Sequence, residues 1–196
     1  MSDGVVIGGD GLARCSWAAA AADYVEYHDA EWGVPVHGEQ ALFERLTLEA
    51  FQSGLSWLTI LRKRPAFRAA FAGFDPEVVA GYGPDDVERL LGDPGIVRNK
   101  SKILAAVTNA RAVLAVRDAV PGGLDALVWS FAPASRPAPR RPGDVPGSTP
   151  ESKALAKGLR GYGLVFVGPT TAYAAMQACG LVDDHLAGCH ARRAAS

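Results

Sequence analysis

The stretch Gly92-Asp93-Pro94-Gly95-Ile96-Val97-Arg98-Asn99 decides how the middle of this chain is expected to fold. Its two glycines and its proline are typical of a tight turn. Residues 85–91 before it read as a short helix, and residues 102–116 after it form a longer helical pattern rich in Ala, Leu and Val. Helix, glycine turn and helix together predict a helix-hairpin-helix motif.

The helical pattern continues on both sides of this motif. Residues 39–53 carry Leu42, Phe43, Leu46 and Ala50 at three- and four-residue spacing, as in an amphipathic helix. Asp75-Pro76 and Thr149-Pro150-Glu151 are helix starts, with a capping side chain followed by a proline at the first helical position. Val165-Phe166-Val167 is too short and isolated for a sheet. The predicted fold class is therefore all-α.

Composition divides the chain into a folded unit and two tails. Residues 1–12 are glycine-rich and predict a loose tail, and residues 191–196 a second one. Residues 13–190 are expected to form a single catalytic unit. Within it, residues 13–37 would join residues 150–190 in one lobe, and residues 38–132 would form the helix-hairpin-helix lobe. Residues 133–150, with six prolines, would connect them as an extended segment.

Charge and cysteine content exclude several classes of protein. The formal net charge is −1, so binding to nucleic acid would need a local basic patch, such as residues 62–64 or 98–102. The alternative is that these runs are solvated faces. No apolar run approaches about 18 residues, so we expect no membrane span. Three cysteines and no signal peptide predict a cytoplasmic protein.

Two pairs of possible metal ligands lie at opposite ends of the chain. Cys15 and His28 form a Cys-x12-His pair, and His185 and Cys189 form a His-x3-Cys pair. Two cysteines and two histidines suit Zn²⁺ in a closed tetrahedral site. One shared ion would join the two ends and close a loop of more than 150 residues. The alternative is that the cysteines are small buried hydrophobes.

A carboxylate and a group of aromatic residues are candidates for a binding pocket. Glu49 follows Leu42 and Leu46 on the apolar stripe of its helix, where a carboxylate loses hydration and needs a partner. It is either a structural carboxylate at the end of that stripe or a functional group. The aromatic candidates are Trp17, Tyr24, Tyr27, Trp32 and Trp57. Such rings can line a binding pocket, and the alternative is ordinary core packing.

Three long blocks of the chain have an unusual composition. They are Arg14-Cys15-Ser16-Trp17, Tyr27-His28-Asp29-Ala30-Glu31-Trp32-Gly33-Val34-Pro35 and Leu48-Glu49-Ala50-Phe51-Gln52-Ser53-Gly54-Leu55-Ser56-Trp57. With Met176-Gln177-Ala178-Cys179-Gly180-Leu181-Val182-Asp183-Asp184-His185, they closely resemble the 3-methyladenine DNA glycosylase I family, a branch of the helix-hairpin-helix glycosylases. The resemblance runs from about Arg14 to Cys189, with the blocks in family order.

The resemblance implies roles for individual residues. A structural Zn²⁺ would be held by Cys15, His28, His185 and Cys189, leaving Cys179 in the core. Glu49 would be the catalytic residue that hydrogen-bonds the modified adenine, while Trp57 stacks on the base and Tyr27 contacts its edge. The remaining pocket walls would be Trp17, Tyr24 and Trp32. The hairpin would anchor the DNA backbone through Gly95, Val97, Arg98, Lys100 and Lys102, although Asn99-Lys100-Ser101 departs from the His-Arg-Gly expected there.

The implied activity is hydrolysis of the N-glycosidic bond of 3-methyladenine in double-stranded DNA, by a monomer without lyase activity. Wider relatives place a catalytic Asp after a Gly-Pro pair, whereas here Gly168-Pro169 is followed by two threonines. Lys100 lacks the partners expected of a Schiff-base lysine. The alternatives are a non-catalytic, zinc-stabilised protein that binds damaged DNA, and a metalloenzyme with catalytic zinc.

Overall fold

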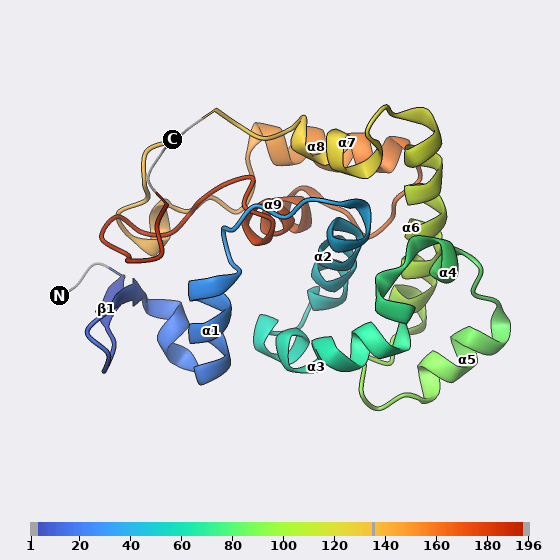
Figure 1. Cartoon of the computed structure of the whole chain (residues 1–196), viewed down its shortest axis with the longest axis horizontal. Helices are drawn as coiled ribbons and strands as arrows, with labels where there is room; N and C mark the ends of the chain where they lie inside the picture. Colours follow the sequence, from blue (N-terminus) through green and yellow to red (C-terminus); the bar gives the residue numbers. More distant parts are fainter. Residues whose placement is uncertain (1–3, 135, 194–196) are drawn as a thin grey trace.

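The computed structural model describes residues 4–134 and 136–193, and it is predominantly helical (Figure 1). The helices are α1 Ala22–Ala30, α2 Glu39–Gln52, α3 Trp57–Ala70, α4 Pro76–Ala80, α5 Pro84–Gly92, α6 Lys100–Ala119, α7 Gly123–Trp129, α8 Pro150–Gly161 and α9 Pro169–Ala178. One two-stranded sheet pairs β1 Val5–Ile7 with β2 Ala13–Cys15. No helix in these two described ranges combines the length and the apolar character of a membrane span.

The predicted helix starts are confirmed by their caps. The Asp75 carboxylate accepts a hydrogen bond from the backbone N–H of Glu77 at 2.9 Å, and Pro76 begins α4. The Thr149 hydroxyl accepts one from the N–H of Ser152 at 3.2 Å at the start of α8. These side chains satisfy N–H groups that the first helical turn leaves unpaired.

Helix α2 lies at the centre of the molecule, where it contacts α3, α6, α7 and α9 (Figure 1). Its apolar face meets phenylalanines from α3 and the turn that follows. The Phe51 ring lies 4.7 Å from the Phe67 ring and 5.9 Å from the Phe71 ring, centroid to centroid. Burying rings of this size is among the larger single contributions to a core. The main core also contains side chains of α8 and α9, so the division into two lobes stays a prediction.

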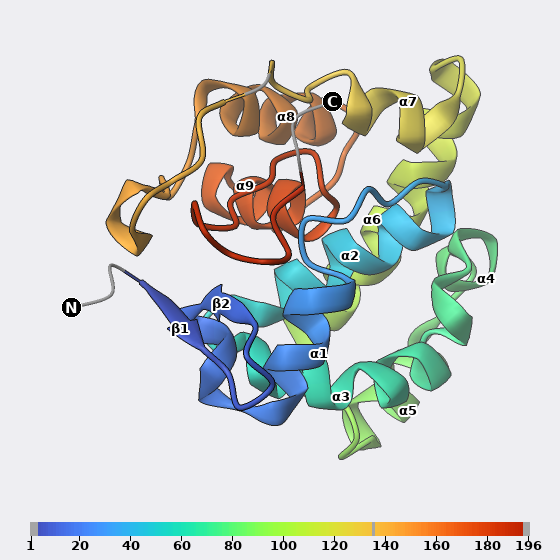
Figure 2. The ribbon, with the colours of Figure 1, turned by 60° about the vertical axis from the view of Figure 1, so that its left-hand side comes forward.

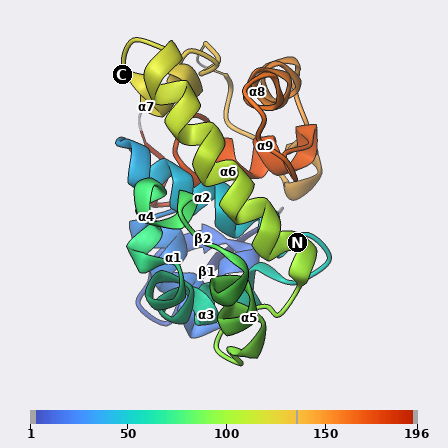
Figure 3. The ribbon, with the colours of Figure 1, turned by 90° about the vertical axis from the view of Figure 1, so that its right-hand side faces the viewer.

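The predicted motif of helix, turn and helix is present as α5, the turn of residues 93–99, and α6 (Figure 3). The Asn99 side chain accepts a hydrogen bond from the N–H of Lys102 at 3.1 Å and caps α6. The Asp93 carboxylate accepts one from the N–H of Gly95 at 2.7 Å, and Lys63 donates to the carbonyl of Pro94 at 2.8 Å. The turn is therefore fixed both from within and by α3.

The N-terminal region differs from the loose tail predicted for residues 1–12. Strand β1 pairs antiparallel with β2, with Val5 opposite Cys15, so this part of the segment is ordered (Figure 2). Residues 1–3 lie outside the described residues.

Near the other end of the chain, the N–H of His190 donates to the carbonyl of Ala13 at 2.8 Å, and Arg192 donates to the carbonyl of His185 at 2.7 Å. The two ends of the described chain thus lie against each other.

Candidate functional site

A cavity of about 180 Å³ opens between α1, α2, α3 and α9. It is lined by Trp17, Tyr24, Tyr27, Trp32, Glu49, Gln52, Trp57, Ala174 and Gln177. The structure thus brings together all five aromatic residues proposed from the sequence, and Glu49 as well. Sequence reasoning missed Gln52, Ala174 and Gln177. Gln52 lies one helical turn after Glu49, so the i, i+3 spacing is the signal that could have found it.

The aromatic walls support one another through their edges. The Trp17 ring lies 5.5 Å from the Tyr24 ring and 5.1 Å from the Trp32 ring, both nearly perpendicular to it. The Tyr27 and Trp57 rings lie 5.4 Å apart at 48°. The Tyr24 hydroxyl accepts a hydrogen bond from the N–H of Leu58 at 2.9 Å, which joins α1 to the first turn of α3. Edge-to-face contacts of this kind leave some ring faces free for a planar ligand.

Glu49 is the most unusual group in the cavity. Its side chain belongs to the buried face of α2, with only 5% of the residue exposed. Burial raises the pKa of Glu49 to about 8, and the nearby Arg45 guanidinium opposes this only in part. Arg45 is already paired with Glu31 at 2.8 Å, as is Arg64 at 2.6 Å. Glu49 is therefore a buried carboxyl group without a full counter-charge, which its raised pKa keeps protonated at neutral pH, and this is the pattern of a functional group.

Tyr27 lies in the same cavity, near Glu49. Its side chain is 3% exposed, and burial, together with the nearby Glu49, raises the pKa of the Tyr27 phenol well above its usual range. The phenol therefore keeps its proton and can donate a hydrogen bond. The cavity thus offers one carboxyl group and one phenol donor between aromatic walls.

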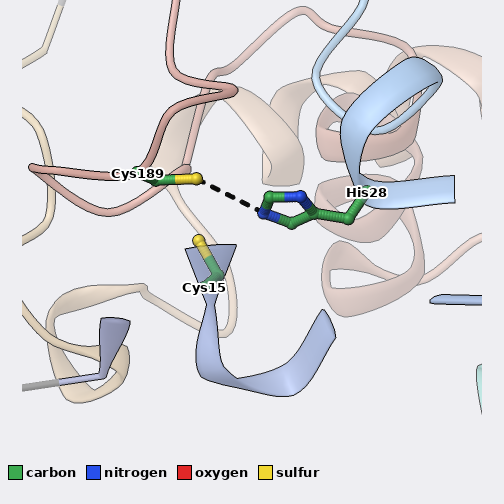
Figure 4. Close-up of side chains that lie close together, drawn as sticks. All are labelled: Cys15, His28 and Cys189. Carbon is green, nitrogen blue, oxygen red and sulfur yellow. Dashed lines mark hydrogen bonds between the residues drawn. The ribbon is translucent and has the colours of Figure 1, made fainter. Parts of the chain in front are cut away.

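Three of the four predicted metal ligands meet in one cluster. One ligand atom from each of Cys15, His28 and Cys189 lies within 4.8 Å of the others, and all three residues are buried. The Cys189 sulfur points toward the His28 ring and lies 3.4 Å from His28 Nε2, and the Cys15 sulfur points toward the Cys189 sulfur (Figure 4). His185 lies beside this cluster rather than in it, because its ring packs against His28 at 4.7 Å, edge to face.

The histidines carry a hydrogen-bond pattern that suits metal ligands. His28 Nδ1 lies 2.8 Å from an Asp29 carboxylate oxygen, and His185 Nδ1 lies 2.7 Å from Asp183. A carboxylate on Nδ1 leaves Nε2 as the atom for a metal and fixes the ring. Burial raises the pKa of the Cys15 thiol to about 12, so a thiolate there needs a cation beside it. The donor set therefore fits Zn²⁺.

The residues proposed for the DNA backbone have different environments. Arg98 and Lys100 are exposed, and Val97 is half-buried against the main core. Lys102 faces inward instead: its ammonium donates to the carbonyls of Phe51 at 2.8 Å and Ser53 at 2.5 Å. The reason is that this position of α6 faces the C-terminal end of α2, where carbonyls lack helical partners.

Gly95 lies inside the turn, where its backbone N–H donates to the Asp93 carboxylate. Arg98 and Lys100 remain as the exposed side chains of the predicted set that can approach DNA.

Comparison with known proteins identifies the family of this chain. The family model described as methyladenine glycosylase matches residues 17–193. The chain is 45% identical to the DNA-3-methyladenine glycosylase 1 of Escherichia coli, over 91% of this chain and 96% of that protein. It is 43% identical to the DNA-3-methyladenine glycosylase of Haemophilus influenzae, over 90% and 96%. The chain belongs to the methyladenine glycosylase family.

Solved structures show the same fold. A crystal structure of 3-methyladenine DNA glycosylase I superposes with a TM-score of 0.87 at 45% identity, covering 92% of this chain and all of that one. The enzyme from Staphylococcus aureus, studied for its recognition of 3-methyladenine, gives 0.88 at 34% identity over 93% and 98%. The helical architecture described above is therefore that of this family.

Proposed function

We propose that this protein is a DNA glycosylase that removes 3-methyladenine from alkylated DNA by hydrolysing its N-glycosidic bond. The observation that carries the proposal is the buried Glu49 in an aromatic cavity, in a chain of this family. A base inside a duplex cannot reach such a cavity, so the nucleotide is extruded before it reacts.

The cavity recognises a flat, positively charged base. Trp57 stacks on the base and the other aromatic walls enclose it, at about 1–3 kcal/mol for each stacked base. A nucleotide methylated at N3 of adenine is cationic, so electron-rich rings add a cation–π contribution. Its charge also lowers the pKa of Glu49 and favours the carboxylate, which accepts a hydrogen bond from the base edge. Tyr27 donates to the same edge.

The chemical step needs little acid catalysis. The bond from C1′ of the sugar to the base breaks with its electron pair leaving on the base, which becomes neutral. Water adds to C1′ and loses a proton. Because the leaving group is already cationic, the protein orients it and stabilises charge rather than protonating it.

Zinc would stabilise the fold without taking part in the reaction. Cys15, His28 and Cys189 would hold the ion, with the adjacent His185 as fourth ligand. Four protein ligands leave no open position for a substrate. The support for this proposal is the buried cluster and the carboxylate on each Nδ1.

DNA would be contacted beside the turn between α5 and α6. Exposed Arg98 and Lys100 lie at the N-terminus of α6, where the helix dipole favours a phosphate. We infer that the protein acts on double-stranded DNA as a monomer.

Release of free base from methylated DNA tests the proposal. The purified protein should liberate 3-methyladenine from a methylated duplex and nothing from an unmethylated duplex of the same sequence. A protein that binds the methylated duplex but releases no base would instead be the non-catalytic damage-binding protein. Measuring binding and release on the same duplex separates these two functions.

A further inference from the structure

Gln177 on α9 lines the same cavity as Glu49 on α2, and its role follows from its hydrogen-bond partner. Its Nε2 amide group donates to a carboxylate oxygen of Asp184 at 2.9 Å. Asp184 lies in the loop after α9 and is 7% exposed. The same carboxylate oxygen accepts a hydrogen bond from the Tyr173 hydroxyl, and Arg136 lies 3.6 Å from the other oxygen. Asp184 is thus also held by a second side chain of α9 and by Arg136 from the proline-rich segment.

This contact determines which end of the Gln177 amide faces the cavity. The oxygen and nitrogen of a glutamine amide are distinguished by their hydrogen-bond partners rather than by shape. A carboxylate accepts hydrogen bonds and cannot donate them, so the NH₂ group must face Asp184. The other end of the amide is the carbonyl oxygen Oε1. No donor from residues 4–134 or 136–193 bonds to this oxygen, and it is not among the fully buried atoms without a partner.

We propose that Asp184 orients Gln177 so that Oε1 faces the cavity as a second acceptor, and that this acceptor selects adenine-type over guanine-type bases. The inference rests on the proposed function, because it takes the cavity as the base pocket. The exocyclic amine of 3-methyladenine carries two hydrogens, one for Glu49 and one for Gln177. 3-Methylguanine carries a carbonyl oxygen at that position. That oxygen and Gln177 Oε1 are both acceptors, so they repel each other and neither gains a hydrogen bond. In a buried site this costs 3-methylguanine much of its binding free energy.

The charge state of the base does not change this selection. 3-Methyladenine and 3-methylguanine are both cationic in DNA, so stacking and the field of Glu49 treat them alike. A hydrogen-bonding group is therefore needed to distinguish them. Gln177 would be the specificity-determining residue, and Asp184 its positioning residue.

The test measures the ratio of affinities for free 3-methyladenine and free 3-methylguanine by quenching of tryptophan fluorescence. Gln177→Met keeps the length of the side chain and removes the acceptor. We expect the ratio to fall about tenfold, mainly through weaker binding of 3-methyladenine. In Asp184→Asn, the amide oxygen of the new side chain faces Arg136 and its NH₂ group faces Gln177. The Gln177 amide then turns over to accept from it, and the ratio of affinities should fall as in Gln177→Met.

Tyr173→Phe is the matched control, because it removes one donor to Asp184 but leaves the carboxylate facing Gln177. We expect an unchanged ratio in this variant, even if its melting temperature falls. An unchanged ratio in Gln177→Met overturns the proposal, and a lowered ratio in Tyr173→Phe shows that any damage to the network has the same effect. Failure of the wild type to release 3-methyladenine from DNA would refute the proposed function instead. Base release with an unchanged Gln177→Met ratio refutes only this inference.

Discussion

Replacing Glu49 with Gln should make the folded protein more stable while making it a poorer glycosylase. Burial raises the pKa of Glu49 from 4.5 to about 8. Between these pH values the folded chain keeps a proton that the unfolded chain releases. The free energy of unfolding of the wild type therefore falls with rising pH through this window. Gln cannot ionise, so the variant loses this contribution to the pH dependence.

The magnitude follows from the width of the window. Each pH unit costs the wild type about 1.4 kcal/mol, so the stability of Glu49→Gln relative to the wild type should rise by about 3 kcal/mol between pH 4.5 and 7. This difference in the free energy of unfolding should level off near pH 8, at no more than about 5 kcal/mol. Any fixed cost of placing the amide nitrogen in the cavity is the same at every pH. The slope therefore isolates the ionisation of Glu49.

Urea unfolding of both proteins at several pH values between 5 and 8.5 measures this slope. Glu26→Gln is the control, since it removes the same formal charge from an exposed position on α1. In the same preparations, Glu49→Gln should release 3-methyladenine from DNA roughly 10- to 100-fold more slowly. A constant stability difference across this range would show that Glu49 is not desolvated as described. Wild-type excision by the variant would show that its carboxylate serves the fold alone.

Three further changes test other parts of the site. Cys189→Ala should abolish zinc binding and lower the melting temperature. Cys179→Ala, in the main core, should keep the zinc. Elemental analysis measures the zinc content of each variant, and thermal unfolding measures its melting temperature. Trp57→Ala should weaken binding of free 3-methyladenine by roughly 5- to 150-fold, from a stacking energy of about 1–3 kcal/mol. The wild type should show little activity on hypoxanthine, ethenoadenine or 7-methylguanine, and borohydride should trap no covalent adduct with DNA.

Opposite results would each remove one part of the proposal. Full zinc content in Cys189→Ala would place the metal elsewhere. Unchanged affinity in Trp57→Ala would make that ring a core residue. Robust release of hypoxanthine, or an adduct lost in Lys100→Ala, would point to a broader or bifunctional enzyme.

Features with a local signal in the sequence were predicted well. The three- and four-residue spacing of α2 placed Glu49 on the buried face, and that burial is confirmed. The caps at Asp75 and Thr149 fixed helix starts because a cap depends only on residues within one turn. The motif blocks identified the family, which the comparisons confirm.

Features that depend on distant partners were not predicted. Lys102 looked like part of a basic run, but the carbonyls it binds belong to Phe51 and the neighbouring Ser53, about 50 residues earlier. Pairing of β1 with β2 was missed because strands of three residues carry no periodic signal. The contact of Gln177 with Asp184 was missed because it depends on how the loop after α9 turns back.

The meeting of Cys15 and His28 with Cys189 has a consequence for how the protein is made. His28 and Cys189 are 161 residues apart in the chain. At about 5–20 residues per second, a ribosome adds Cys189 roughly 8–32 s after His28. During that interval the segment that carries Trp17, Tyr24 and Tyr27 lacks its contact with Cys189. A nascent chain therefore completes this cluster last, after Glu49, Trp57 and Gln177 of the cavity have already been made.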